Sequence, residues 1–386
     1  MHLTREEERT LDGEEGDGPA KAMELLVALG EIYDADELIP IESAQIAGVS
    51  YKTMGDAGLE FIEDFSRKVD VKVRTMLNPA GMDLQNPMNE SDEFREKQKR
   101  LIHAYGRMGI EVSCTCTPYF AGNRPKRGAH LAWSESSAVS FANSVLGART
   151  NREGGPSALM AAVIGKTPDY GLHRKENRAP TVVIEAEKGT SSALLGHIVG
   201  KKVGEGIPYF QGFSPDEDEL KSLGAAMAAT GSVALYHVQD ITPEADDFDI
   251  KDLKTIHVTK EDIQKLRDEL ITEKKPEVVV IGCPHLSGAE IKNIAKKLKG
   301  KEKRKDSPDL RLYTSRFVKE RNPEAVKIIE RFGSVIADTC MVVSPLEDEY
   351  SVSATDSGKA ATYLPKLTGQ EVLYADRETL LEMMIC

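Results

Sequence analysis

The sequence predicts an α/β protein whose sheets are mainly parallel. Three observations support this fold class: helical and strand patterns alternate along most of the 386 residues, 40% of the residues are hydrophobic, and several apolar runs end directly in polar loops. A chain of this length usually divides into two or three domains of roughly 150 residues each. The composition is therefore that of a folded chain with a large buried core.

The N-terminal part of the chain alternates between helical apolar spacing and short strands. Ser91 precedes the strongest helical pattern and is a good N-cap, while polar and apolar residues alternate from Val71 as in a half-buried strand. We expect helices over residues 18–33, 56–68, 91–108 and 135–146, and strands over residues 71–77 and 110–112. The second strand leads into the loop that carries Cys116, so residues 1–170 are assigned to a first α/β domain.

Two polar junctions divide the rest of the chain. The stretch from Gly171 to Pro180 is polar and bounded by proline, and an acidic segment begins at Pro243. Around these junctions we expect strands over residues 181–185, 232–236, 278–281, 310–314 and 334–338, and helices over 191–203, 215–229, 287–298 and 316–332. The resulting assignments are a middle α/β domain, residues 171–250, and a C-terminal α/β domain, residues 251–386.

The charge balance argues against a protein that binds nucleic acid. Lys and Arg number 50 against 63 Asp and Glu, which gives a formal net charge of −13. A phosphate backbone requires a basic surface, and this composition does not favour one. A small anionic substrate needs only a few local donors, so the sequence remains compatible with one.

The sequence also predicts that the chain does not enter a membrane. No apolar run approaches the roughly 20 residues of a membrane-spanning helix. The polar start, Met1 to Glu8, lacks the apolar core of a signal peptide, which predicts a cytoplasmic protein. Five cysteines, an odd number in a large chain, indicate reduced thiols rather than a disulfide framework.

Three of the five cysteines occupy similar positions, where a predicted strand gives way to a loop. Cys116 follows the strand at 110–112, Cys283 follows an apolar run, and Cys340 follows the strand at 334–338. Ligands of open α/β sheets bind at the carboxyl ends of strands, so these thiols can share one site. Three thiolates from distant loops suit an iron–sulfur cluster with one iron left without a protein ligand. Such an iron can act as a Lewis acid on a substrate hydroxyl, which favours loss of water.

Other interpretations of the cysteines stay open at this point. Most free cysteines are small buried hydrophobic residues, and all of these could be structural in a metal-free α/β binding subunit. Zinc is a further possibility, although Cys114 and Cys116 are spaced more tightly than a usual zinc pair. A non-enzymatic iron–sulfur or zinc sensor is an alternative of a different class.

Several short motifs place hydrogen-bond donors where an anionic substrate can bind. The turn at Gly48, Val49 and Ser50 follows an expected strand, and its N–H groups and hydroxyl can hold a carboxylate or phosphate oxygen. Arg152 lies in a glycine-rich polar stretch and can hold a carboxylate in a bidentate manner. The candidate substrate-binding residues are Gly48, Val49, Ser50, Asn78, Pro79, Ser136, Ser137, Arg152 and Lys359. Each motif also has a simple structural explanation as a strand–helix turn, a helix N-cap or a surface turn.

Two further features of the sequence lie near the C-terminal cysteines. The segment from Asp356 to Lys359 is not interpreted as a P-loop, because its first glycine is missing, Ala360 replaces the required Ser or Thr, and no clear strand precedes it. Lys359 is instead a candidate point charge for a substrate phosphate. His285 is the one histidine that adjoins a candidate cysteine ligand, where it can hydrogen-bond a sulfur or the substrate or simply satisfy a core contact.

Five segments, in this order, resemble the aconitase X family. They are AQIAGVSYKT at 44–53, TCTPY at 115–119, NREGGPS at 151–157, GCPH at 282–285 and ADTC at 337–340. The resemblance runs along nearly the whole chain, which makes it specific. Aconitase X proteins are dehydratases distantly related to aconitase. The resemblance thus implies an aconitase-like fold, with three layered α/β domains around a central cluster cleft and a mobile fourth domain closing the site.

The resemblance further implies a split enzyme. The chain ends at Cys386 without room for the fourth domain, so it resembles the large subunit of the split, archaeal-type form, with that domain on a separate small subunit in a heterodimer. Split members are implicated in dehydrating (R)-5-phosphomevalonate to trans-anhydromevalonate 5-phosphate, a hydro-lyase step in a modified mevalonate pathway to isoprenoids. Fused relatives dehydrate cis-3-hydroxy-L-proline, which is the alternative within the family.

The resemblance also implies roles for individual residues. The matching cysteines, Cys116, Cys283 and Cys340, would ligate a 4Fe-4S cluster, with Cys114 as the rival of Cys116. In the aconitase relatives the base that removes the proton is a serine on the mobile domain. No catalytic base is therefore expected on this chain, and the chain alone should be inactive or nearly so.

Overall fold

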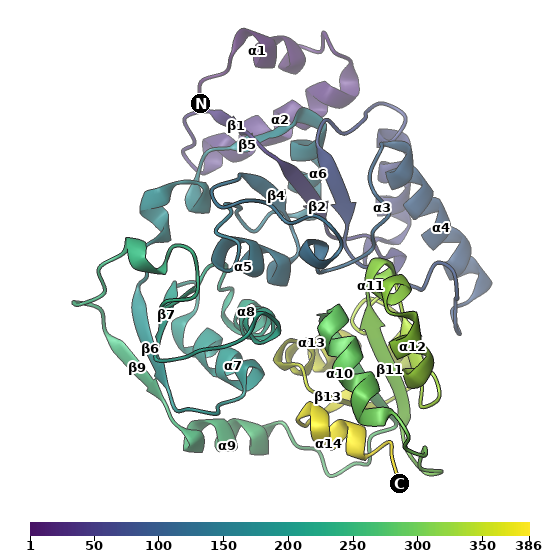
Figure 1. The fold of residues 1–386 in the computed structure, drawn as a ribbon. Coiled ribbons are helices and arrows are strands. Elements are labelled where there is room, and N and C mark those ends of the chain that lie inside the picture. Colours follow the sequence, from purple (N-terminus) through teal and green to yellow (C-terminus); the bar gives the residue numbers. More distant parts are fainter.

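The computed structural model describes residues 1–386 and forms three α/β bodies built on four sheets. Figure 1 shows the N-terminal body, in purple to blue, above the middle body in teal and the C-terminal body in green to yellow. Helix α8 (Glu217–Gly231) of the middle body packs against α5 (Ser136–Ser144) of the first and α13 (Gly358–Thr368) of the third. The α/β fold class with largely parallel sheets is confirmed.

The N-terminal body is built on a parallel sheet in the order β3-β2-β4, with a small antiparallel pair, β1-β5, beside it. Its strands are β1 (Leu38–Pro40), β2 (Ser43–Ile46), β3 (Arg74–Leu77), β4 (Leu131–Trp133) and β5 (Lys166–Pro168). Its helices are α1 (Arg5–Leu11), α2 (Asp17–Ile32), α3 (Tyr51–Phe65), α4 (Asp92–Arg107), α5 and α6 (Gly155–Ile164). One large apolar core lies between the sheet and α2, α3, α4 and α6, and a smaller core lies between α5 and β4.

Helix α6 was not expected from the sequence. Its residues are buried almost without exception, so it has no polar face to give the usual helical period. It begins after the N-cap Gly154 with Pro156 in its first turn, and it ends at Gly165, whose φ of +78° suits a glycine C-cap. The polar stretch before it therefore serves as the entry to a buried helix that packs on β2.

The strand expected over residues 110–112 does not form, and only an isolated bridge joins Met76 to Glu111. The side chain of Ser113 replaces the missing ladder, because its hydroxyl accepts from Leu77 N at 3.0 Å and donates to Leu77 O at 3.1 Å. Cys114 then takes a φ of +43°, which turns the chain away from an extended path. The segment still runs beside β3 and delivers Cys116 to the end of that strand.

The middle body holds a parallel sheet in the order β8-β7-β6-β9. Its elements are β6 (Val182–Ala186), α7 (Ser192–Val203), β7 (Pro208–Gln211), α8, β8 (His237–Val238), β9 (Thr255–Val258) and α9 (Lys260–Glu269). The predicted domain boundary at residue 250 falls before β9, which pairs with β6.

The strand expected over residues 232–236 is replaced by an irregular segment that leads to β8. Its polar backbone groups are satisfied by side chains of α5: Asn143 Nδ2 donates to Ala234 O at 2.9 Å, and Tyr236 N donates to Ser144 Oγ at 2.9 Å. Apolar content alone suggested a strand, but these contacts with the first body take the place of a neighbouring strand.

The C-terminal body has a five-stranded parallel sheet in the order β12-β11-β10-β13-β14. Its strands are β10 (Val278–Leu286), β11 (Asp309–Thr314), β12 (Ser334–Ile336), β13 (Val352–Thr355) and β14 (Glu371–Tyr374). Its helices are α10 (Gly288–Leu298), α11 (Arg316–Arg321), α12 (Pro323–Ile329), α13 and α14 (Arg377–Glu382). The single helix expected over 316–332 is two helices, because Pro323 lacks an N–H and starts a new helix after Asn322.

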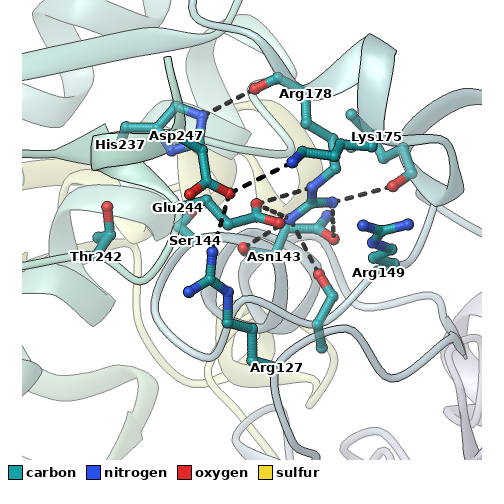
Figure 2. A network of polar contacts seen from close by, with 12 residues as sticks. Arg127, Asn143, Ser144, Arg149, Lys175, Arg178, His237, Thr242, Glu244 and Asp247 are labelled. Atoms are coloured by element: carbon teal, nitrogen blue, oxygen red, sulfur yellow. Dashed lines mark hydrogen bonds and ion pairs between the residues drawn. The ribbon is translucent and has the colours of Figure 1, made fainter.

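A buried polar network joins the first body to the middle one (Figure 2). Arg178 is fully buried and pairs with Glu244 at 2.6 Å, while its guanidinium also donates to the carbonyls of Asn143, Ala148 and Leu172. His237 bonds the Arg178 carbonyl through Nε2 at 2.9 Å. A fully bonded pair of this kind fixes geometry, and breaking it leaves a buried charge.

A second joint lies between the first and third bodies. Arg316 bonds Asp83 at 2.6 Å and Asp338 at 2.5 Å, and Ala80 N donates to Asp338 O at 2.8 Å. These contacts tie the loop after β3 to the loop that carries Cys340. None of the helices has the length and apolar character that a membrane crossing requires.

Candidate active site

The structure brings Cys116, Cys283 and Cys340 together from two bodies. Cys283 lies in the last part of β10, Cys340 follows β12, and Cys116 lies beyond the end of β3. The thiol of Cys340 is close enough to those of Cys116 and Cys283 for a charge on it to raise the pKa of each. Strand ends that are remote in the sequence thus meet at one place, as expected for sheets of this kind.

Two of the three sulfur atoms face backbone hydrogen-bond donors. His285 N donates to Cys116 Sγ at 3.2 Å, and two backbone N–H groups after Cys340 face its thiol. At Cys283, the Ser357 hydroxyl donates to the backbone carbonyl and lies beside the thiol. Burial raises the pKa of all three thiols, that of Cys283 to about 12, and the donors oppose this rise. Hydrogen bonds to a cysteine sulfur favour its thiolate form, which is the form that binds a metal centre.

This set of residues fits an iron–sulfur cluster by its chemistry, because it offers three thiols, one buried and two half-buried, and backbone donors at two of them. No three His, Cys, Asp or Glu side chains lie close enough together to hold one metal ion between them. The cysteine ligands of a cluster bind different irons, so their sulfur atoms need not converge on a single point.

Cys114, the rival of Cys116, lies elsewhere. It is fully buried in the core of the first body, where the Ala80 N–H faces its thiol. Burial raises the pKa of this thiol, and the negative charge of Asp338 adds to the rise. Cys386 is exposed at the C-terminus. The structure therefore groups Cys116, rather than Cys114, with the other two candidate ligands.

A buried ion pair lies against these cysteines. Lys359 at the start of α13 pairs closely with Glu135, the N-cap residue of α5, and its charge lowers the pKa of Cys116 and Cys283 against the effect of burial. Asn78 Nδ2 donates to Glu135 Oε2 at 2.9 Å, and Ser137 Oγ donates to Glu135 Oε1 at 3.1 Å. Three polar groups, an amide, a hydroxyl and an ammonium, thus contact one carboxylate.

The Glu135 carboxylate is ionised in this setting. Burial alone would raise its pKa, but the charge and hydrogen bond of Lys359, together with the Asn78 amide, outweigh burial and hold the pKa at about 2. Burial would likewise lower the pKa of Lys359, and the nearby negative groups raise it instead. At neutral pH the site therefore contains a carboxylate and an ammonium, both shielded from water.

Glu135 was missed by the sequence analysis, although its neighbours were identified. Of the predicted residues, Asn78, Ser137 and Lys359 contact Glu135 directly, and Ser136 Oγ lies 3.4 Å from its carboxylate. An acidic residue at an N-cap position gave the only signal, and that signal is equally typical of an ordinary helix start.

The turn at Gly48, Val49 and Ser50 lies beside the Cys340 loop. Gly48 has a φ of +78°, and the hydroxyl of Ser50 donates to Val343 O at 2.9 Å rather than capping α3. Lys52 reinforces this contact by donating to Ser344 O at 3.0 Å. The turn is thereby fixed to the loop that follows the third cysteine.

The remaining predicted residues differ in their surroundings. Pro79 is buried between Asn78 and the bridge that joins Ala80 to Thr339. Arg152 is exposed just before α6, outside the group around Glu135. A Cβ on Gly155 would lie 2.4 Å from Ala47 O, so the stretch that carries Arg152 approaches the turn at residues 48–50 closely.

The prediction that no clear strand precedes residues 356–359 was wrong. The segment from Asp356 to Lys359 does follow a strand, β13, and opens α13 with Ser357 as its N-cap. The strand was missed because four residues, Val352–Thr355, give too short a pattern to recognise. The missing first glycine and Ala360 still distinguish the segment from a P-loop.

Comparison with known proteins agrees with this architecture. The models of the Aconitase X first, second and third domains match residues 1–176, 180–268 and 276–385 in turn. The chain therefore belongs to the aconitase X family. The crystal structure entitled Thermococcus kodakaraensis aconitase X (holo-form) is 49% identical, with a TM-score of 0.93 over 99% of both chains.

Two relatives carry a more particular name. The chain is 51% identical to the phosphomevalonate dehydratase large subunit of Methanosarcina mazei, over 98% of this chain and 96% of the relative. It is 51% identical to the protein of the same name from Methanocaldococcus jannaschii, over 99% and 100%. The cis-3-hydroxy-L-proline dehydratase of Pseudomonas aeruginosa is 33% identical, over 95% of this chain and 67% of that protein.

Proposed function

We propose that this chain is the large subunit of a phosphomevalonate dehydratase, a hydro-lyase of a modified mevalonate pathway. The observation that supports it most is the identity of about half of all positions to two proteins of that name over nearly their full length. The hydroxyproline dehydratase is much less similar and extends well beyond the matched region. We propose the same substrate and product as for the split family members, (R)-5-phosphomevalonate and trans-anhydromevalonate 5-phosphate.

The proposed cofactor is a 4Fe-4S cluster held by Cys116, Cys283 and Cys340. When bound, the cluster supplies one open iron that acts as a Lewis acid toward the substrate hydroxyl. The three neighbouring thiols, with backbone donors at Cys116 and Cys340, support this assignment. Free thiols and an open cluster iron both suit a reducing compartment, so we also propose a cytoplasmic location.

The protein groups of this chain bind and orient the substrate. The reaction removes the C3 hydroxyl and one C2 proton, and the electron pair of the C2–H bond becomes the C2–C3 double bond. Lys359 offers a largely buried positive charge, which attracts a phosphate or carboxylate. The backbone N–H groups of the turn at residues 48–50 and the second N–H of the Asn78 amide offer donors from two other directions.

Glu135 organises these donors rather than exchanging a proton. Its pKa of about 2 keeps it ionised, so it accepts hydrogen bonds from Asn78 and Ser137 and holds Lys359 in place. We propose that Pro79 and Ser136 complete this binding surface and that Arg152 reaches the substrate from the entrance. The base that removes the C2 proton is proposed to lie on a small subunit.

We propose a heterodimer in which the small subunit carries the mobile domain. The relatives named large subunit support a partner, and the match covers only 67% of the hydroxyproline dehydratase, so about one third of that protein lies outside it. The three α/β bodies of this chain, with β9 and α9 belonging to the middle one, would form the fixed part of the enzyme.

The proposal is tested by an anaerobic assay of this chain with the small subunit, followed by proton NMR. We expect the vinyl proton of the anhydro product from (R)-5-phosphomevalonate only with both chains and iron present. Turnover of cis-3-hydroxy-L-proline instead would move the protein to the alternative activity. An iron-containing complex that is silent with both substrates would contradict the proposal and favour an iron–sulfur sensor.

A further inference from the structure

His285 connects the loops of all three candidate cysteine ligands. It lies two residues after Cys283 and is fully buried. Its backbone N–H donates to Cys116 Sγ at 3.2 Å, its Nδ1 lies 3.0 Å from Thr115 Oγ1, and its Nε2 lies 2.9 Å from Thr339 O. One residue therefore contacts Cys116 and the neighbours of both Cys116 and Cys340.

The contacts of the His285 ring define its tautomer. The Thr339 carbonyl can only accept, so Nε2 must carry the hydrogen and donate to it. Nδ1 is then the acceptor for the Thr115 hydroxyl in the neutral ring. That hydroxyl oxygen in turn accepts from Thr117 N at 3.1 Å, so the Cys116 loop is bonded to the ring through residues on either side of the cysteine.

His285 also touches the middle body through its backbone. Lys221 of α8, which is buried and paired closely with Glu290, donates to His285 O at 3.4 Å. The residue thus contacts all three α/β bodies, with Thr115 in the first, Lys221 in the middle one and Thr339 in the third. A shift of any body relative to the others would break one of these bonds.

The other buried histidines do not share this arrangement. His173 and His197 each leave Nε2 without a partner, and His237 leaves Nδ1 without one. A histidine that only fills space in a core resembles these three. His285 is the buried histidine with both ring nitrogens bonded, and each bond reaches a different cysteine loop.

We propose that His285 is a positioning residue that holds the thiols of Cys116, Cys283 and Cys340 in the arrangement that receives the cluster. The inference rests on the proposed function, because it takes these cysteines as ligands. The positioning of the thiols applies both to the cluster-free chain and to the chain with the cluster bound. Outer contacts of this kind typically change metal affinity or activity about 10–100-fold when they are removed.

The first test uses the cluster-free chain and measures alkylation of individual cysteines by N-ethylmaleimide, followed by mass spectrometry. His285→Leu removes both ring bonds and keeps the backbone donor to Cys116. We expect Cys116 to react about tenfold faster than in the unchanged chain, because two buried hydrogen bonds that hold its loop are lost and the loop opens more readily. Cys114, two residues away but bonded elsewhere, should react as slowly as before.

Two gentler variants and a control separate positioning from general destabilisation. His285→Gln retains a donor near Thr339 O, and Thr115→Val removes only the hydroxyl partner, so both should give intermediate increases at Cys116. The control His237→Leu also removes a buried ring that bonds a backbone carbonyl, and it should leave Cys116 unchanged. Equal increases at Cys114 and Cys116, or no increase in the folded His285→Gln and Thr115→Val variants, would overturn the inference.

The second test follows the cluster in the anaerobically reconstituted two-chain complex. We expect the His285 variants to release iron about 10–100-fold faster during exposure to a chelator and to show an altered electron paramagnetic resonance signal after reduction. Unchanged release and signal would overturn the inference. An unmodified complex that takes up no iron would instead contradict the proposed function, while the alkylation result would still decide whether His285 positions the thiols.

Discussion

Replacing Lys359 with methionine should destabilise the folded chain by about 3–5 kcal/mol at neutral pH, because it leaves the Glu135 carboxylate buried without its counter-charge. The structure supports this magnitude in a second way. The pKa of Glu135 lies at about 2 against an ordinary 4.5. At about 1.4 kcal/mol per pKa unit, its surroundings favour the ionised form by about 3 kcal/mol even after the opposing effect of burial.

The pH dependence of stability should change its sign in this variant. In the unchanged chain the pKa of Glu135 is lower in the folded state, so its contribution is present above about pH 4.5 and is lost as the pH falls towards 2. Without Lys359, burial raises the pKa of Glu135 above its ordinary value. The variant should therefore regain part of its lost stability when the pH falls from 7 to 5.

Urea denaturation of the cluster-free chain at pH 7 and pH 5, followed by circular dichroism, measures both effects. Lys297→Met is the matched control, because its pair with Glu378 is exposed to water and salt and should contribute little to stability. A Lys359→Met chain that loses less stability than this control, or that follows the pH profile of the unchanged chain, would refute the reasoning.

The remaining predictions concern the ligands, the joint between bodies and the entrance. Cys116→Ser should abolish visible absorbance and iron content of the anaerobically purified complex, whereas Cys114→Ser should leave both intact; the reverse result would make Cys114 the ligand in place of Cys116. Arg178→Met should lower the free energy of unfolding by about 3–5 kcal/mol in urea, since Glu244 stays buried, and a loss below about 1 kcal/mol would show that the network in Figure 2 is not stabilising. Arg152→Ala should leave the free energy of unfolding within about 0.5 kcal/mol and raise the KM for (R)-5-phosphomevalonate about tenfold in steady-state assays, and an unchanged KM would remove Arg152 from the site.

The sequence predicted those elements that show a clear period. The amphipathic helix α4 and the apolar strand β10 were both found, because one face or the whole element is apolar over enough residues. Helix α6 and strand β13 were missed for opposite reasons, one being buried on all sides and the other being too short. The segment at 232–236 was mistaken for a strand, since nothing local reveals that side chains of α5 satisfy its backbone.

The candidate site was predictable where chemistry is local. Cysteines at strand ends and donors at turns can be recognised from a few residues. Glu135 can be recognised as a site residue only from its ion pair with Lys359, which lies 224 residues further along the chain. The importance of His285 likewise depends on Thr115, 170 residues before it, and on Thr339. Such pairings are created by the packing of three bodies, which no single segment encodes.

Mössbauer spectroscopy of the two-chain complex loaded with ⁵⁷Fe, before and after substrate addition, tests the central claim most directly. If three thiols of this chain hold a cluster with one open iron, (R)-5-phosphomevalonate should change the signal of one iron and leave the others as they were. Cis-3-hydroxy-L-proline should have no such effect. A cluster whose irons all remain unchanged with (R)-5-phosphomevalonate would contradict the account.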